Sequence, residues 1–267
     1  MDCQLRDHHD RPCADWLWRI GDGRVTITLL HLFPRDLGAS GDSGNVQTVA
    51  YRLRERGIDV SIKTFSGTED LPESPDVVFM GNGPWAAAVR SLDVLRPHGK
   101  KLQEWARQGI SFCAVGTGAE ILSEKIVSPH GSPTLGLGVF PFTAHRDEAR
   151  LVGYNTCESA LGQIVGFSDV SSVWVRNEKA SLLGHGTIGP KRMSRDDGVL
   201  MGPSIATQIG GPLLALNPHI ADWIIGKVAA RRKLSLAATE LPTDSLATKA
   251  RQVILDNMDQ VFTTIAL

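Results

Sequence analysis

Short apolar runs alternate with glycine-rich loops and amphipathic stretches through the first half of the chain. The run from Val25 to Phe33 is continuous and of strand length, which is typical of a strand buried on both faces of a parallel sheet. Residues 47–56 then carry apolar side chains at helical spacing. The pattern continues with predicted strands over 58–65 and 76–84 and a predicted helix over 92–108. This alternation predicts an α/β fold with a mostly parallel sheet flanked by helices.

Residues 109–123 form the stretch around which the rest is organised, because a buried strand runs there into a tight glycine turn and then a helix. In α/β folds such a turn lies at the carboxyl end of the sheet, where nucleophiles and anion sites are built. The residue at the turn is Gly116, and no Ser or Cys occupies this position. Cys113 lies inside the strand, where a small thiol is usually core filler. Thr117 could act only if a base reached it, and a turn threonine more often bonds its own backbone.

Three glycine-bearing loops follow predicted strands or precede predicted helices. They are Gly41 to Asn45, Gly81 to Gly83, and Gly116 to Gly118. Each one taken alone can simply mark the end of a strand. Because the carboxyl ends of parallel strands meet at one edge of the sheet, we expect the three to converge and form a site.

The second half of the chain has a different sequence pattern. Over 131–202, short β-type runs are separated by Gly, Ser, Asp and Asn, which favours an antiparallel or mixed β region. A short strand then leads into a helix capped near Asn217 and Pro218. Residues 244–263 have the spacing of an amphipathic helix. Apolar side chains on that helix and around Trp85 would be left exposed in a lone chain, so we predict an interface there and a heterodimer.

These patterns divide the chain into three segments. Residues 1–24 are polar and are interpreted as an N-terminal extension, residues 25–232 as the α/β domain, and residues 233–267 as a C-terminal helical segment of the same domain. The extension has histidines and cysteines but no fourth ligand at a fitting spacing. We therefore predict no metal site and no cofactor.

Composition narrows the class of protein. The 267 residues are 42% hydrophobic and 21% charged, with 28 basic and 29 acidic side chains, so nothing indicates nucleic acid as a partner. The four cysteines show no paired spacing, and no apolar run is long enough to span a bilayer. These features predict a cytoplasmic location without a membrane span.

An ordered series of motifs runs from Val25 to Met258, and the order and spacing are more specific than any one motif. With this series the chain resembles the class I glutamine amidotransferases of the cobyric acid synthase type. It is most similar to the GatD-type glutaminase subunits of lipid II isoglutaminyl synthases, which work with a Mur-ligase-like (MurT-like) subunit. The motifs are GDSGN (41–45), GNGP (81–84), AVGTGAEIL (114–122), GLGVF (136–140), RLVG (150–153), GF (166–167), GHG (184–186) and IATQIGGPLLALNP (205–218).

The chain departs from the family at the catalytic positions. The resemblance places the family's nucleophilic cysteine at Gly116 and its base histidine at Gly210, so neither catalytic residue is intact. The neighbouring family Tyr and Gln are Ala119 and Glu120. The cysteine of such a turn is typically strained, and glycine adopts positive φ without that cost.

Other site residues are implied by the resemblance. Arg150 matches an arginine that pairs with the α-carboxylate of glutamine, and Asp42 matches an acidic loop residue. The backbone amides of Gly83 and Thr117 match an oxyanion hole. Glu120 would bring a negative charge that disfavours a second carboxylate. For Arg150 the alternative is a solvated surface arginine.

Three functions remain open at this point. The first is a non-hydrolytic partner or scaffold of a Mur-ligase-like amide synthetase. The second is a glutaminase subunit with relocated chemistry, using Cys113, Thr117, Glu120 or His185. The third is a sensor that binds glutamine or a related amino acid through Arg150.

Overall fold

A computed structural model describes residues 25–188, 193–236, 240–259 and 262–266. The predicted extension over 1–24 lies outside these residues. None of the helices in the described ranges combines the length and the apolar character needed to cross a membrane.

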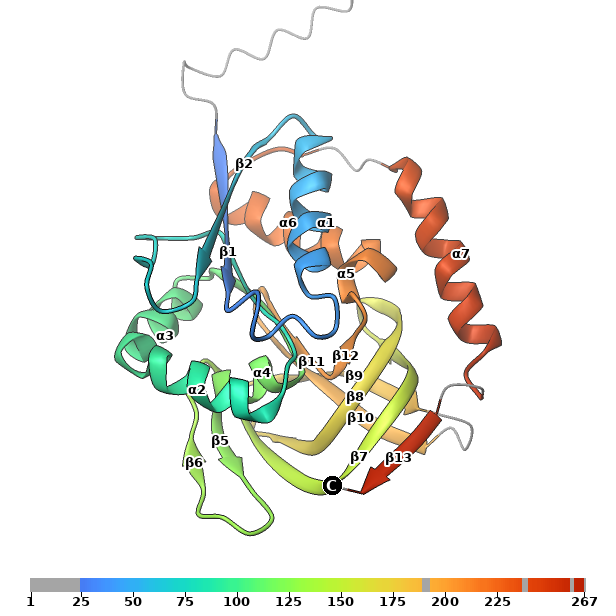
Figure 1. Ribbon diagram of the computed structural model, residues 1–267. Helices are drawn as coiled ribbons and strands as arrows, with labels where there is room; N and C mark the ends of the chain where they lie inside the picture. Colours follow the sequence, from blue (N-terminus) through green and yellow to red (C-terminus); the bar gives the residue numbers. More distant parts are fainter. Residues whose placement is uncertain (1–24, 189–192, 237–239, 260–261, 267) are drawn as a thin grey trace, which may run out of the picture.

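Five parallel strands form the first half of the sheet, in the order β2-β1-β3-β4-β11 (Figure 1). Each pair in this order is parallel, which confirms the predicted parallel sheet. The continuous apolar runs are explained by burial on both faces. The strands are β1 (Thr26–Leu32), β2 (Asp59–Phe65), β3 (Val77–Met80), β4 (Ser111–Val115) and β11 (Ser204–Thr207).

Helices cover both faces of this half. Alternate strand residues point to opposite faces, so Leu29 packs in one hydrophobic cluster with α1, α5 and α6, and Leu30 packs in another with α2, α3 and α4. In Figure 1, α1 and α5 lie to the right of β1 and β2, and α2 and α3 lie below these strands, toward the left. The helices are α1 (Ser43–Arg54), α2 (Trp85–Leu95), α3 (Gly99–Arg107), α4 (Gly116–Leu122), α5 (Leu213–Leu216) and α6 (Pro218–Arg232).

The single helix predicted over 92–108 is wrong in its bounds. Helix α2 already begins at Trp85, directly after Pro84, and a 3₁₀ turn at Arg96–His98 separates it from α3. Pro97 lies in that turn. Proline lacks the N–H that would continue an α-helix, so the chain tightens and changes direction there.

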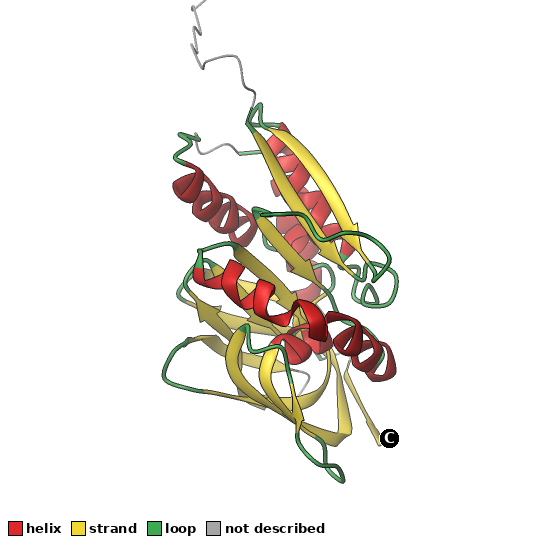
Figure 2. Ribbon diagram, turned by 90° about the vertical axis from the view of Figure 1, so that its left-hand side faces the viewer, coloured by secondary structure: helices red, strands yellow, loops and turns green. Residues whose placement is uncertain are grey.

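Antiparallel strands form the second half, as predicted, and they join the first half in one sheet. Their order is β12-β8-β7-β9-β10-β11, so β11 pairs with an antiparallel neighbour on one side and with β4 on the other. Figure 2 shows these long, curved strands gathered in the lower part of the molecule. They are β7 (Phe140–Ser159), β8 (Gly162–Arg176), β9 (Ser181–Ile188), β10 (Met193–Met201) and β12 (Ile209–Gly210); β5 (Ser123–Val127) and β6 (Thr134–Leu135) lie beside them.

The C-terminal helix is shorter than predicted. Helix α7 covers Pro242–Asp256, and strand β13 (Phe262–Ala266) follows and pairs with β7, so the helix predicted over 244–263 is wrong at its C-terminal end. The segment nevertheless contains an amphipathic helix.

The buried face of α7 and its exposed face both carry apolar residues. Ala247 and Ile254 are buried, and Ile254 packs in a small hydrophobic cluster with Val165 of β8 and with Met258, which follows the helix. Leu246 and Val253 are 62% and 58% exposed. These two side chains are the leftover apolar groups that the sequence predicted for this helix.

Candidate functional site

The three glycine loops meet at the carboxyl ends of β1, β3 and β4. The Ala39 N–H donates to the carbonyl oxygen of Asn82 at 2.9 Å, and the Gly118 N–H donates to the carbonyl oxygen of Gly81 at 3.1 Å. These bonds join the loop before α1, the loop after β3 and the start of α4. The predicted convergence is confirmed, and it falls where ligands bind in open α/β sheets.

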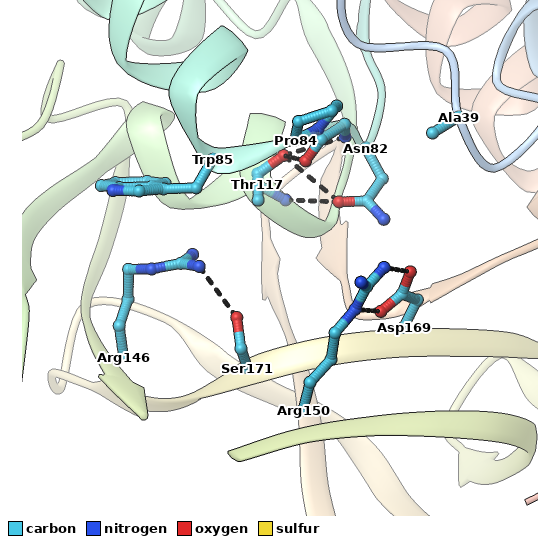
Figure 3. A pocket seen from close by; sticks show the side chains of 10 residues that line it. Ala39, Asn82, Pro84, Trp85, Thr117, Arg146, Arg150, Asp169 and Ser171 are labelled. Atoms are coloured by element: carbon cyan, nitrogen blue, oxygen red, sulfur yellow. Dashed lines mark hydrogen bonds and ion pairs between the residues drawn. The ribbon is translucent and has the colours of Figure 1, made fainter. Parts of the chain in front are cut away.

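A pocket of about 340 Å³ opens beside these loops (Figure 3). Its upper wall comes from the loops and α4, and its lower wall comes from β7 and β8. The lining residues are Ala39, residues 82–85, Thr117, Arg146, Arg150, Asp169 and Ser171.

Gly116 has the positive φ expected for this turn, +54°. A Cβ atom at this position would lie only 2.5 Å from Cγ of Asn82. The Asn82 carboxamide therefore occupies the space into which any side chain at position 116 would project. A nucleophile placed there would first have to displace Asn82.

The two backbone amides expected to form an oxyanion hole are already hydrogen-bonded. The Thr117 N–H donates to Oδ1 of Asn82 at 3.0 Å, and the Gly83 N–H donates to Oγ1 of Thr117 at 3.0 Å. The Thr117 hydroxyl lies 3.2 Å from Oδ1 of Asn82 and 2.9 Å from the carbonyl oxygen of Gly83, either of which can accept its proton. An oxyanion would have to replace both acceptors before it could use these amides.

The space beside Gly210 is filled as well. A Cβ atom there would lie 2.9 Å from Cβ of Ser40, and the carbonyl oxygen of Ser40 accepts the Gly211 N–H at 3.1 Å. The Asn82 Nδ2 group donates to Oγ of Ser40 at 3.2 Å. A single hydrogen-bonded pair, Ser40 with Asn82, thus fills the side-chain spaces of both glycines. We call it the Ser40–Asn82 pair.

Asp42 supports this pair and does not line the pocket. It is 2% exposed, and its Oδ2 accepts the N–H of Asn82 at 3.1 Å and the N–H of Ser40 at 3.3 Å. Its Oδ1 is buried with no hydrogen-bond partner among the described residues. Burial raises the pKa of Asp42 from 3.8 to about 6. The structure therefore places Asp42 as a positioning group behind the pocket wall.

Arg150 lies in the pocket wall, and its guanidinium is already paired. Its Nε and Nη2 atoms both donate to the carboxylate of Asp169 on β8. These hydrogen bonds raise the pKa of Arg150. The arginine side chain is 40% exposed and that of Asp169 is 23% exposed, so both can contact a ligand. Arg150 lines the pocket, but its guanidinium charge is offset by Asp169.

Glu120 is buried beneath the pocket and does not line it. Its carboxylate accepts hydrogen bonds from Nη1 of Arg146 and, at 2.6 Å, from Oγ of Ser172. The Arg146 guanidinium lies 4.1 Å from the centre of the Trp85 ring and donates to Oγ of Ser171 at 2.8 Å. The negative charge that the sequence placed in the pocket is therefore offset by Arg146.

The proposed relocated catalytic residues do not form a nucleophile–base pair within the described residues. Burial raises the pKa of the Cys113 thiol far above its usual range, which disfavours the thiolate. Thr117 has only Asn82 and Gly83 as hydrogen-bond partners for its hydroxyl. His185 lies on β9, 73% exposed and paired with Asp196, away from the pocket lining.

Sequence reasoning missed the residues that decide this site. Asn82 is inside the GNGP motif and Ser40 directly precedes GDSGN, so both adjoin glycines of recognised motifs, but neither was singled out. Asp169 and Arg146 carried no signal in the sequence pattern. Their roles depend on which way side chains from different elements point.

No protein-family model matches the chain. The chain is 26% identical over 241 residues to the GatD subunit of glutamine-hydrolysing lipid II isoglutaminyl synthase from Staphylococcus aureus, a match that covers 88% of this chain and 97% of that protein.

Two solved structures are similar in fold. One is a glutamine amidotransferase with a TM-score of 0.50 and 16% identity, covering 75% of this chain and 98% of that chain. The other is a glutamine amidotransferase from Thermotoga maritima with a TM-score of 0.49 and 13% identity, covering 88% and 90%.

Proposed function

We propose that this chain, a GatD-like glutamine amidotransferase subunit with the class I fold, is a non-hydrolytic partner or scaffold of a Mur-ligase-like amide synthetase in the cytoplasm. The observation that carries the proposal is the Ser40–Asn82 pair, which fills the side-chain spaces of Gly116 and Gly210. These are the positions at which the resemblance places the family's nucleophile and base. The synthetase would then use free ammonia or another amine.

Hydrolysis of the glutamine amide needs a nucleophile, a base that activates it and free donors for the oxyanion. Glycine supplies neither a nucleophile nor a base. Both expected donors, the amides of Gly83 and Thr117, are satisfied by side chains of the chain itself. All three requirements fail at the same place, which supports loss of the reaction more strongly than one substitution would.

The first test is an ammonia-release assay with glutamine, together with mass spectrometry after exposure to a glutamine-analogue electrophile. We expect no turnover and no covalent label. Gly116→Cys alone should not restore turnover, because Gly210 still provides no base and Asn82 still occupies the space. Turnover by the wild type that disappears in Cys113→Ala would contradict the proposal and support relocated chemistry.

A rebuilt site provides the matched control. Gly116→Cys combined with Asn82→Ala removes the side chain that blocks a residue at position 116. We expect this double variant to react with the electrophile faster than Gly116→Cys alone. Equal labelling of the two variants would show that Asn82 does not obstruct the position.

Two observations support a partner. The curated relative is one subunit of a larger synthase, as its name states. Leu246 and Val253 lie two turns apart on the same exposed face of α7, where a partner could bury them. We expect the chain to co-purify with a Mur-ligase-like protein encoded beside it. Leu246→Lys with Val253→Lys should abolish that association while leaving the melting temperature unchanged. A monodisperse monomer in the presence of that neighbour would contradict the heterodimer.

A second candidate function is supported by the pocket itself. Its volume is about 340 Å³, and Arg150 lines it. A non-hydrolytic subunit that binds an amino acid would act as a sensor. Calorimetry with amino acids tests this candidate, and absence of heat would leave the scaffold alone.

A further inference from the structure

We infer that the pocket binds a zwitterionic α-amino acid whose side chain is short and uncharged, and that Asn82 excludes glutamine by occupying the place of its amide. The inference rests on the proposed non-hydrolytic function. It adds the class of ligand and two residues that determine it, Asn82 and Asp169.

The charges of the Arg150–Asp169 pair match a zwitterion. Arg150 uses Nε and Nη2 on Asp169, which leaves the donors of Nη1 for a ligand carboxylate. Asp169 is 23% exposed and has remaining acceptor sites for a ligand ammonium group. Figure 3 shows this pair at the base of the pocket, below Asn82. An ion pair that faces a ligand with both signs favours a molecule that itself carries both signs.

The same pairing disfavours anions. Arg146, the other cation of the lining, is paired with the buried carboxylate of Glu120. Two guanidinium groups and two carboxylates thus leave the pocket with no excess positive charge. A ligand with a second carboxylate would find no unpaired cation there, so glutamate and aspartate should bind poorly.

The length limit comes from Asn82. Its carboxamide oxygen accepts the Thr117 N–H, and its nitrogen donates to Ser40. A glutamine side chain extending from the Arg150–Asp169 pair toward Gly116 would meet this carboxamide, whose hydrogen bonds it would have to replace. Glycine, alanine or serine would leave the Ser40–Asn82 pair intact. Asn82 is therefore the specificity-determining residue of the pocket.

Titration calorimetry of the full chain with L-serine, L-glutamine and L-glutamate tests the inference. We expect L-serine to bind at least about tenfold more tightly than glutamine, since poor fit of even one methylene has effects of that size. N-acetyl-L-serine lacks the ammonium charge and should not bind. No heat with L-serine or glycine would overturn the inference, and so would glutamine binding as tightly as L-serine.

Three variants separate the roles of the residues. Asn82→Ala should shift the ratio of affinities toward glutamine by about tenfold, because it opens space at the Gly116 end. Asp169→Asn should weaken L-serine by about tenfold or more, since it removes the charge that faces the ammonium group. His185→Ala, on β9 outside the pocket lining, is the control and should change neither affinity.

The two proposals fail in different ways. Ammonia release from glutamine by the wild type would refute the non-hydrolytic function. Absence of ammonia together with equal binding of glutamine and L-serine would refute only the ligand class. If a variant fails to fold, as judged by its melting curve, the ratio of L-serine to glutamine affinity in the wild type still decides the inference.

Discussion

Replacement of Gly116 by alanine tests the central observation on the site, because it asks whether Asn82 really fills the space. Two costs add. Alanine at φ +54° is strained by about 1 kcal/mol relative to glycine. Its Cβ atom would also lie 2.5 Å from Cγ of Asn82 and displace that side chain. Asn82 would then lose its bonds to Thr117 and Ser40, worth about 1 kcal/mol each. The expected loss of unfolding free energy is about 3 kcal/mol.

A matched glycine isolates the backbone cost. Gly202 has φ +55°, and a Cβ atom there would meet nothing within 4 Å. Gly202→Ala should therefore cost only the strain, about 1 kcal/mol. The difference of about 2 kcal/mol between the two variants is the contribution of Asn82.

A double-mutant cycle then assigns the difference to one contact. Asn82→Ala alone leaves the Thr117 N–H without its acceptor and should cost about 1–3 kcal/mol. In the Asn82→Ala background, Gly116→Ala should cost only about 1 kcal/mol, which gives a coupling of about 2 kcal/mol. Urea denaturation monitored by circular dichroism measures all four proteins. Equal costs for Gly116→Ala and Gly202→Ala, or additive costs in the cycle, would refute the occupancy of this space by Asn82.

Two further predictions concern buried charges. Burial raises the pKa of Asp42 from 3.8 to about 6, so the folded protein binds this proton more tightly than the unfolded chain does. The resulting stabilisation is full below about pH 4 and is lost as the pH rises through about 6. Urea denaturation at pH 4.5 and 7 should show a decline of about 2 kcal/mol in the wild type and not in Asp42→Asn. The same decline in both proteins would contradict this assignment. Arg52, which is 2% exposed, pairs with Asp244 at the start of α7 and with Asp222 on α6. Arg52→Met should cost about 2 kcal/mol, because Asp244 loses this ion pair while Asp222 still pairs with Arg56. In Arg52→Met, amide hydrogen exchange should become faster in α7 than in the other helices. An equal increase in all helices would show that the Arg52–Asp244 ion pair does not hold α7 in place.

Much of the fold could be predicted from the sequence because its signals are local. The apolar runs of β1 and β3 and the helical spacing of α1 repeat over a few residues, and burial on both faces of a parallel sheet requires such runs. The bounds of α2 and α7 were missed. Helix α2 begins at Trp85, directly after the loop that lines the site. Helix α7 ends at Asp256, and the chain from Phe262 onward pairs with β7 instead of continuing the helix, a contact that lies outside the segment.

The sequence by itself determined that positions 116 and 210 carry no side chain. Gly116 and Gly210 have no side chain, so no arrangement of the rest of the chain can make them a nucleophile or a base. Only the tertiary structure decided what stands in their place. Ser40 and Asn82 are 42 positions apart and meet because loops after β1 and β3 end at the same edge of the sheet. Asp169 reaches Arg150 in the same way, from the neighbouring strand β8. The direction of a side chain and its partner across strands are set by packing, and no local pattern records them.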